Sequence, residues 1–260
     1  EIRGGPATLA TRLAESIKRS GGIVRLDTPV LRLAYDESGE AIGVDLLSGE
    51  TVVARKAIVS NLTIWDTYGK LVGLNRTPPE IKKTLNALHG TGAYLVYATI
   101  EDSAISRLPA ERLLAETTPI TSDDEQFSEF TCAIHGQTAT LKSATDVHDW
   151  FTFHASEEDF EESDQAALEH FWTKLHAALP ELGSGIEIIE TANPRTCYDQ
   201  TRRKLGMIMG LSSGLLPAQI PSATTVIPNL LIVGDTVTAI PDLAHVTETA
   251  FSVAEKIKNH

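Results

Sequence analysis

The chain has 260 residues, of which 42% are hydrophobic and 22% charged, a composition typical of a folded globular protein. Lys and Arg number 22 against 35 Asp and Glu, and the net charge of −13 argues against binding to nucleic acid or to an anionic membrane surface. The sequence has no apolar run near the roughly 18 residues that a membrane span needs. Its two cysteines do not indicate a disulfide scaffold, so a cytoplasmic location is expected.

The N-terminal segment is predicted to be helical almost from its start. Leu9, Leu13 and Ile17 recur at helical spacing, Pro6 suits a first helical turn, and Gly21 suits the end of a helix. The sequence shows neither an initiator Met nor a signal peptide at this end. We therefore expect the chain to begin inside a larger protein.

A series of short strands is predicted to follow this helix. Their expected ranges are 23–26, 30–35, 41–47 and 51–54, and they are separated by turns that contain Pro or Gly. The apolar run at 57–60, which ends at Asn61, is typical of a buried strand in a parallel or mixed sheet.

The remaining elements alternate between helices and strands. Pro-, Ser- and acid-rich residues at 101–127 predict a loop with a short helix, and a capping box at Ser156 and Asp159 precedes a long amphipathic helix that ends at Pro180. The other predicted elements are a helix at 78–88, strands at 92–100, 128–135, 150–154, 186–191 and 230–233, and a helix at 246–258.

The most informative pattern is the strand at 230–233 followed by Gly234, Asp235 and Thr236. An acidic residue at the carboxyl end of a buried strand lies where α/β sheets bind ligands, and its carboxylate can accept hydrogen bonds from sugar hydroxyls. The N-terminus of the helix that follows favours an electron-rich group. The pattern predicts a site for a ligand with hydroxyls and an electron-rich end, although a plain Gly-Asp turn would give the same residues.

A second motif, Gly210–Gly214, fits the nucleophile pattern G-x-S-x-G with Ser212 at its centre. Asp235 or Asp242 and then His245 follow in the order of a hydrolase triad. The prolines after Ser212 make a poor helix, so a serine hydrolase is the less favoured hypothesis.

Two other groups of residues have side chains of the types that bind ligands: the histidines and a basic cluster. No histidine pair has the spacing of metal ligands, so no metal site is predicted. Arg195, Arg202, Arg203 and Lys204 form a basic cluster in the sequence, which would either meet an anionic ligand or be scattered surface charge.

Four stretches in order carry a resemblance to a known family. They are Gly4-Gly5-Pro6 with its helix and 21–30, then 43–61 with Ser48-Gly49-Glu50, then Asn193-Pro194-Arg195-Thr196 with 206–214, and finally 228–236 with the last helix. Together they resemble the phytoene desaturase and carotenoid isomerase branch of the amine-oxidase-like FAD-dependent oxidoreductases.

The resemblance implies an α/β fold of mixed (α+β) character. Residues 1–61 and 193–260 would form part of a Rossmann-like FAD-binding domain, and residues 62–192 would form a substrate domain with a mixed sheet. Enzymes of this family begin with a G-x-G-x-x-G half-site that holds the FAD pyrophosphate, and this chain has no such motif. The missing half-site is therefore expected upstream in cis, and the chain alone is expected to retain no tight FAD.

The resemblance also implies roles for individual residues. Val30 would contact the adenine end of FAD through its backbone, and Asp235, within Gly234–Thr236, would bind the ribityl chain or the pyrophosphate. His245 and Val246 would present backbone N–H groups to the N1/O2 edge of the flavin. No side chain is implied as catalytic.

The activity implied is hydride transfer between flavin and an apolar substrate, of polyene or isoprenoid type, with peripheral membrane contact of the full-length protein as a further implication. One departure from the family is that residues 237–245 contain no glycine where the family has a glycine-rich run. This favours the alternative hypothesis of a flavin-free module of the same fold that binds a lipid or prenyl group.

Overall fold

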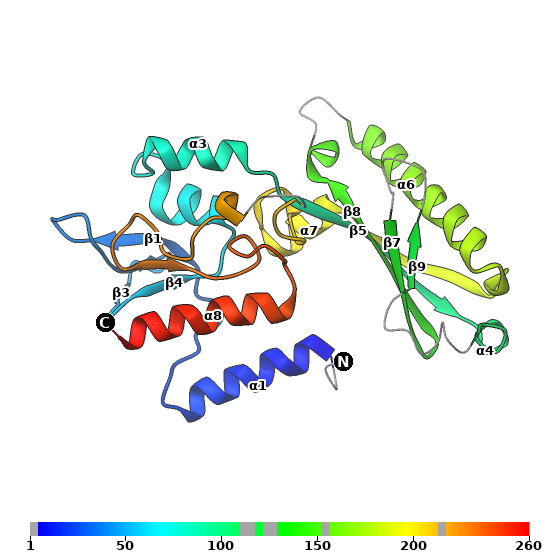
Figure 1. The fold of residues 1–260 in the computed structure, drawn as a ribbon, viewed down its shortest axis with the longest axis horizontal. Helices are drawn as coiled ribbons and strands as arrows, with labels where there is room; N and C mark the ends of the chain where they lie inside the picture. Colours follow the sequence, from blue (N-terminus) through cyan, green and yellow to red (C-terminus); the bar gives the residue numbers. More distant parts are fainter. Residues whose placement is uncertain (1–4, 110–117, 122–128, 152–155, 213–216, 260) are drawn as a thin grey trace.

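The computed structural model describes residues 5–109, 118–121, 129–151, 156–212 and 217–259, which form two lobes (Figure 1). The first lobe contains α1 (Gly5–Arg19), β1 (Val30–Tyr35), β2 (Ala41–Leu46), β3 (Thr51–Val53), β4 (Ile58–Ser60), α2 (Ile64–Asp66), the π-helix η1 (Thr67–Gly73), α3 (Pro79–Ala87), β10 (Leu230–Ile232) and α8 (Leu243–Lys258). The second contains β5 (Thr91–Ile100), α4 (Asp102–Ile105), β6 (Thr118–Thr121), β7 (Glu129–His135), β8 (Thr138–Asp146), η2 (Val147–Trp150), α6 (Glu157–Ala178), η3 (Pro180–Leu182) and β9 (Ile186–Ala192). The chain returns to the first lobe through α7 (Pro194–Thr201), η4 (Lys204–Gly206) and η5 (Pro217–Gln219).

The first lobe is built on two small sheets. β1, β2 and β3 form an antiparallel meander, and β10 pairs with β4 in parallel, with Leu230 opposite Ile58. The backbone N–H of Ala41 donates to the carbonyl of Pro228, which joins the two sheets. The strands predicted at 57–60 and 230–233 are thus confirmed, and they pair with each other in parallel. Leu230, Ile232 and Ser60 are buried, whereas Val59 is exposed.

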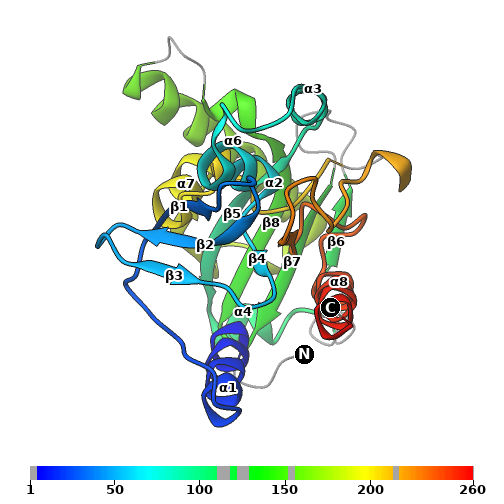
Figure 2. The ribbon, with the colours of Figure 1, turned by 90° about the vertical axis from the view of Figure 1, so that its left-hand side faces the viewer.

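The second lobe is a five-stranded antiparallel sheet in the order β6-β7-β8-β5-β9, of which β5, β8, β7 and β6 are seen side by side in Figure 2. α6 packs along one face of this sheet (Figure 1). Phe171 and Leu175 of α6 are buried against Tyr94 and Val96 of β5. The predicted capping box is confirmed, since Ser156 and Asp159 exchange side-chain and backbone hydrogen bonds at the start of α6.

Each lobe has its own cluster of buried hydrophobic residues. Residues 64–88 contribute Ile64, Trp65 and Leu85 to the cluster of the first lobe, together with β4 and β10. The predicted domain assignment placed 62–192 in one substrate domain, and that division stays a prediction.

The strand predicted at 23–26 does not form. These residues are irregular, and Ile23 and Leu26 are 85% and 78% exposed. A strand needs a neighbour for its backbone hydrogen bonds, and in the described residues no strand lies against this segment. Leu13 and Ile17 of α1 are also exposed, so the part of the chain that the structure describes does not cover the apolar face predicted for this helix.

Other differences are local. Trp150 belongs to a 3₁₀ turn rather than the start of a strand, and residues 152–155 lie outside the described residues. The last helix starts at Leu243, three residues before the predicted position, because Asp242 caps it.

Candidate functional site

The Gly-Asp-Thr motif forms the turn directly after β10. The N–H of Val233 donates to the carbonyl of Ser60 (2.9 Å), so the carboxyl ends of β4 and β10 lie together. Gly234 has φ +123°, a value that L-residues rarely adopt. The buried hydroxyl of Thr236 accepts a hydrogen bond from the N–H of Ile64 (2.9 Å), which fixes the turn to the start of α2.

Asp235 lies at the edge between solvent and protein. Its side chain is 19% exposed, and Nη2 of Arg203 donates to both carboxylate oxygens at 2.8 and 2.6 Å. Asp235 is therefore neither enclosed in the core nor directed into open water. A carboxylate has about four lone-pair positions, so one guanidinium nitrogen leaves capacity for ligand hydroxyls.

The loop at 206–210 approaches this motif closely. A Cβ on Gly210 would lie 2.8 Å from the carbonyl oxygen of Asp235 and 2.6 Å from Cβ of Pro241. Glycine is thus required for this packing. The motif offers an acceptor, the Asp235 carboxylate, on a backbone fixed by glycine, and an acceptor of this kind fits the hydroxyls of the sugar-alcohol part of a flavin dinucleotide.

The N-terminus of α8 is engaged by its own cap. Asp242 Oδ1 accepts from the N–H of His245 (2.8 Å) and contacts its Nδ1 (2.7 Å), and the carbonyl of Asp242 accepts from the N–H of Val246 (3.1 Å). The hydrogen bond from the His245 backbone is the main cause that lowers the pKa of Asp242. A flavin contact by these two amides stays a prediction, and it would require them to exchange partners.

Val30 opens β1, opposite Leu46 of β2, and lies in a different sheet from β10. Its backbone contact with an adenine stays a prediction.

The basic cluster predicted from the sequence does not gather around one ligand position. Arg195 pairs with Glu157, Arg202 pairs with Asp199, and Arg203 pairs with Asp235. Sequence reasoning did not connect Arg203 with Asp235, and nothing in the local sequence of either residue indicates the pair.

A buried carboxylate, Asp66, lies next to the segment that carries Arg203. It accepts hydrogen bonds from the hydroxyl of Thr63 (2.7 Å) and the N–H of Lys204 (3.0 Å), and it pairs with Lys70 (2.8 Å). Burial alone would raise the pKa of Asp66, but the hydrogen bonds from Lys70, Thr63 and Lys204 outweigh it and lower this pKa below 3.8.

We expect Asp66→Asn to lower the free energy of unfolding by about 1–3 kcal/mol at pH 7, because the charge-assisted hydrogen bonds are lost. A lowered folded pKa contributes stability above the unfolded pKa, and this contribution is lost as the pH falls through the folded value. The difference between Asp66→Asn and wild type in urea unfolding should therefore shrink below about pH 4. Asp199→Asn, which removes an exposed partner of Arg202, is the control and should change the free energy of unfolding only slightly. Equal losses for both variants would contradict the expectation.

The geometry does not support the hydrolase hypothesis for Ser212. Ser212 follows an isolated bridge between Leu211 and Gly90, and its hydroxyl accepts a hydrogen bond from that of Thr91 (3.3 Å). Within the described part of the chain no histidine bonds this hydroxyl. His245 is paired with Asp242 at the cap of its own helix, so the triad is not assembled.

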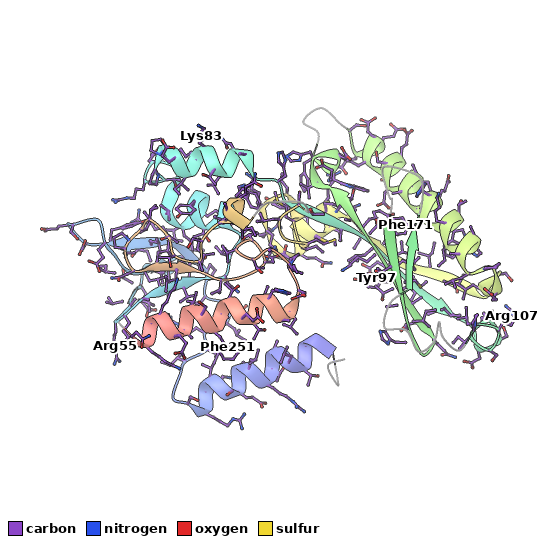
Figure 3. All side chains as sticks on the ribbon, in the orientation of Figure 1. Arg55, Lys83, Tyr97, Arg107, Phe171 and Phe251 are labelled. Atoms are coloured by element: carbon purple, nitrogen blue, oxygen red, sulfur yellow. The ribbon has the colours of Figure 1, made fainter. Side chains whose placement is uncertain are left out.

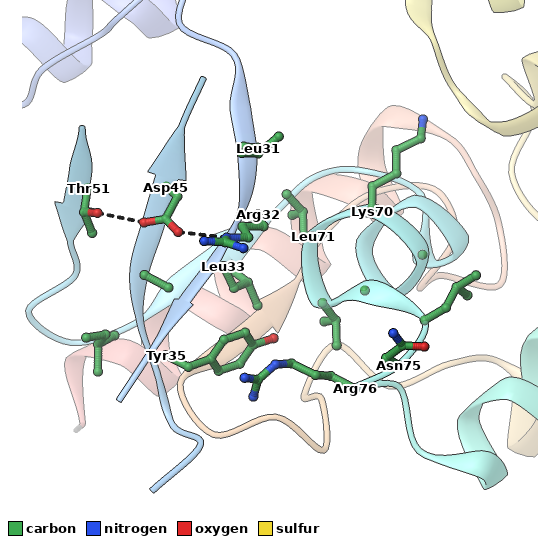
Figure 4. A pocket seen from close by; sticks show the side chains of 16 residues that line it. Leu31, Arg32, Leu33, Tyr35, Asp45, Thr51, Lys70, Leu71, Asn75 and Arg76 are labelled. Atoms are coloured by element: carbon green, nitrogen blue, oxygen red, sulfur yellow. Dashed lines mark hydrogen bonds and ion pairs between the residues drawn. The ribbon is translucent and has the colours of Figure 1, made fainter. Parts of the chain in front are cut away.

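A separate groove of about 1080 Å³ lies between β1, β2 and η1 (Figure 4). It is lined by Leu33, Leu71 and Arg76 among others, and the guanidinium of Arg76 lies 4.4 Å from the ring centre of Tyr35. None of the predicted cofactor residues lines this groove. The other residues of β1, the strand that Val30 opens, do line it.

Comparison with protein families and curated proteins gives consistent matches. The model of the family described as flavin containing amine oxidoreductase matches residues 2–201. The chain is 25% identical over 254 residues to a prolycopene isomerase of Daucus carota, a match that covers 89% of this chain and 40% of that protein. It is 31% identical over 103 residues to an all-trans-retinol 13,14-reductase of Danio rerio, covering 38% of this chain and 17% of that protein. The chain thus spans less than half the length of these relatives.

Solved structures show the same fold. An oxidoreductase from Methanosarcina mazei superposes with a TM-score of 0.66 at 15% identity, over 97% of this chain and 54% of the other. A putrescine oxidase with redesigned cofactor binding superposes with a TM-score of 0.62 at 14% identity, over 98% and 53%. At this identity the likeness concerns the fold.

Proposed function

Because the chain belongs to the flavin containing amine oxidoreductase family, as its resemblance to the carotenoid desaturase and isomerase branch indicated, we propose that the whole protein is an FAD-dependent oxidoreductase. Its reaction is hydride transfer between bound flavin and an apolar, elongated substrate of polyene or isoprenoid type. The substrate class is supported by the names of the relatives, a prolycopene isomerase and a retinol reductase.

The observation that carries this proposal is the position of Asp235. It follows the parallel strand β10, at the edge of the sheet where α/β proteins bind ligands, and it keeps acceptor capacity beside Arg203. When bound, the flavin supplies the redox chemistry. The protein's own residues bind and orient it: Asp235 accepts from its hydroxyls, and Gly234 and Gly210 hold the backbone of the motif in place.

The dinucleotide half-site is proposed to be supplied upstream in cis. Ile23 and Leu26 are exposed on a segment predicted to be a strand, and Leu13, Ile17 and Phe251 leave apolar surface on α1 and α8. Apolar surface of this extent is typical of a face that packs against further protein. We propose that the upstream half covers it and completes the FAD-binding domain.

We expect the purified full-length protein to carry about one FAD per chain, and residues 1–260 alone to carry none. The chain alone has no backbone loop of the G-x-G-x-x-G type to hold the pyrophosphate. The measurement is the flavin absorbance of both proteins after gel filtration, with the flavin released by denaturation and quantified. Stoichiometric FAD on the 260-residue chain would contradict the proposed division of the site. A colourless full-length protein that takes up no added FAD would contradict the proposal that the protein is an FAD-dependent oxidoreductase.

The alternative is a flavin-free module that binds a lipid or prenyl group. The engaged amides of His245 and Val246 favour it, as does the absence of glycine from residues 237–245. A full-length protein that is colourless and retains an extractable lipid would support this alternative over the oxidoreductase.

The partners and the location of the protein are part of the same proposal. We propose an apolar small molecule as substrate, no nucleic acid, a cytoplasmic location and peripheral membrane contact of the full-length protein. Among the described helices, none combines the length and the apolar character needed to cross a bilayer. The curated prolycopene isomerases of Daucus carota and Arabidopsis thaliana are named as chloroplastic, so these relatives do not support the cytoplasmic location.

A further inference from the structure

The segment that carries Arg203 is held rigidly on both sides. The ammonium of Lys70 donates to the carbonyl of Arg202 (2.9 Å), and the carboxylate of Asp66 accepts from the N–H of Lys204 (3.0 Å). Lys70 and Asp66 are themselves an ion pair (2.8 Å). The two residues that flank Arg203 in the chain are thus fixed to one charged pair on α2 and η1.

The backbone of this segment is also strained. Arg202 has φ 55° and Leu205 has φ 51°, both in the left-handed region that residues other than glycine rarely adopt. Such conformations are unfavourable for residues with a side chain and persist where the surrounding contacts impose them. Arg203 lies between these two residues, and its guanidinium reaches Asp235 in the turn after β10.

The guanidinium of Arg203 is fixed at two points. Its Nε donates to the carbonyl of Met207 (2.7 Å), and its Nη2 donates to both oxygens of Asp235. The side chain is 24% exposed. The pair therefore joins two segments that lie 32 residues apart and sets the orientation of the Asp235 carboxylate.

The charge of this pair bears directly on the proposed ligand. A carboxylate at a dinucleotide site accepts hydroxyls, but its negative charge repels a pyrophosphate nearby. The guanidinium of Arg203 offsets that charge, and because it contacts the carboxylate through one nitrogen, lone pairs of Asp235 are left for hydroxyls.

We infer that Arg203 is a positioning residue of the FAD site, which orients Asp235 and offsets its charge so that the anionic dinucleotide can approach. This inference rests on the proposed function. No part of the family resemblance assigned a role to Arg203, and the contact connects residues whose spacing gives no motif.

The test is a double-variant cycle in the full-length protein, with FAD affinity measured by fluorescence titration of the apoprotein. We expect Arg203→Ala to weaken FAD binding roughly ten- to a hundredfold, the effect of removing a charge-assisted contact. In the background of Asp235→Asn, which has no carboxylate charge to offset, Arg203→Ala should change the affinity by less than about twofold. Arg203→Lys keeps the positive charge but cannot contact Met207 and Asp235 at the same time through a guanidinium, so its FAD affinity should lie between those of wild type and Arg203→Ala.

The matched control is Arg32→Ala, which removes another Arg–Asp ion pair of the same lobe, between Arg32 and Asp45 (2.9 Å). It should leave FAD affinity unchanged. Thermal unfolding of each apoprotein shows whether the variant folds, and if Arg203→Ala does not fold, the cycle is run with Arg203→Lys.

Each outcome decides one question. Wild-type affinity in Arg203→Ala would overturn the inference and leave the proposed function intact. An equal penalty in both backgrounds would also overturn it, since Arg203 would then act independently of Asp235. A wild-type full-length protein without FAD affinity would overturn the proposed function and the inference together.

Discussion

Gly206→Ala is expected to destabilise the chain by more than about 4 kcal/mol, a loss large enough to prevent folding of a typical domain. A Cβ at this position would lie 1.9 Å from the carbonyl oxygen of Pro194 and 2.7 Å from its carbonyl carbon. Both atoms are backbone, so no side-chain rotation relieves the overlap. The backbone of Gly206 is also left-handed, with φ +63°.

Neither side of this contact can yield cheaply. Pro194 starts α7, whose first turn is fixed by the Asn193 side chain accepting from the N–H groups of Arg195 and Thr196. Gly206 ends the segment that positions Arg203. Displacement of either element would therefore disturb the candidate site as well as the fold.

Gly136→Ala is the matched control for the Gly206 substitution. Gly136 has a similar φ of +59°, but a Cβ there would meet no atom within 4 Å. It isolates the cost of the left-handed backbone, about 1–2 kcal/mol. Urea unfolding of both variants gives the comparison, and a Gly206→Ala protein no less stable than Gly136→Ala would show that the contact with Pro194 is not rigid.

The sequence predicted those helices and strands that a cap or an apolar run in a few neighbouring residues marks. Ser156 and Asp159 predicted the start of α6, and the apolar runs at 57–60 and 230–233 predicted two strands, although not their pairing with each other. The sequence also contains local signals for α7 and for part of β8. Asn193 followed by Pro194 is typical of a helix start and would have predicted α7. The alternation of polar and apolar residues over 138–142 indicates the first half of β8, whereas the buried Ser143 and Thr145 break this pattern in its second half.

The features that sequence reasoning missed depend on contacts between distant segments. The run 23–26 has the composition of a strand, but strand formation needs a partner, and none pairs with it in the described residues. The π-helix η1 and the pair of Arg203 with Asp235 have no local signature. Similarly, the amides expected to be available at His245 and Val246 are engaged by Asp242, an N-cap residue type that could have been recognised from the sequence as the start of this helix.

Phe171→Ala is expected to cost the chain about 3–5 kcal/mol in urea unfolding, the usual range for removing a buried aromatic ring. Phe171, labelled in Figure 3, lies on the buried face of α6 and is 1% exposed. Its ring centre lies 5.2 Å from that of Tyr94 in β5. The cavity left behind would be lined by the sheet and by Leu175, neither of which can collapse into it without losing its own packing.

Phe251→Ala on α8 provides the contrast, because Phe251 is 67% exposed (Figure 3). In the 260-residue chain it should change stability by less than about 0.5 kcal/mol. If the upstream half covers this face, as proposed, the same substitution should destabilise the full-length protein by clearly more than it does the chain, since the ring is then buried. A full-length protein that tolerates Phe251→Ala as well as the chain does would mean that this face stays in water, and the proposed half-site in cis would lose the structural argument drawn from α8.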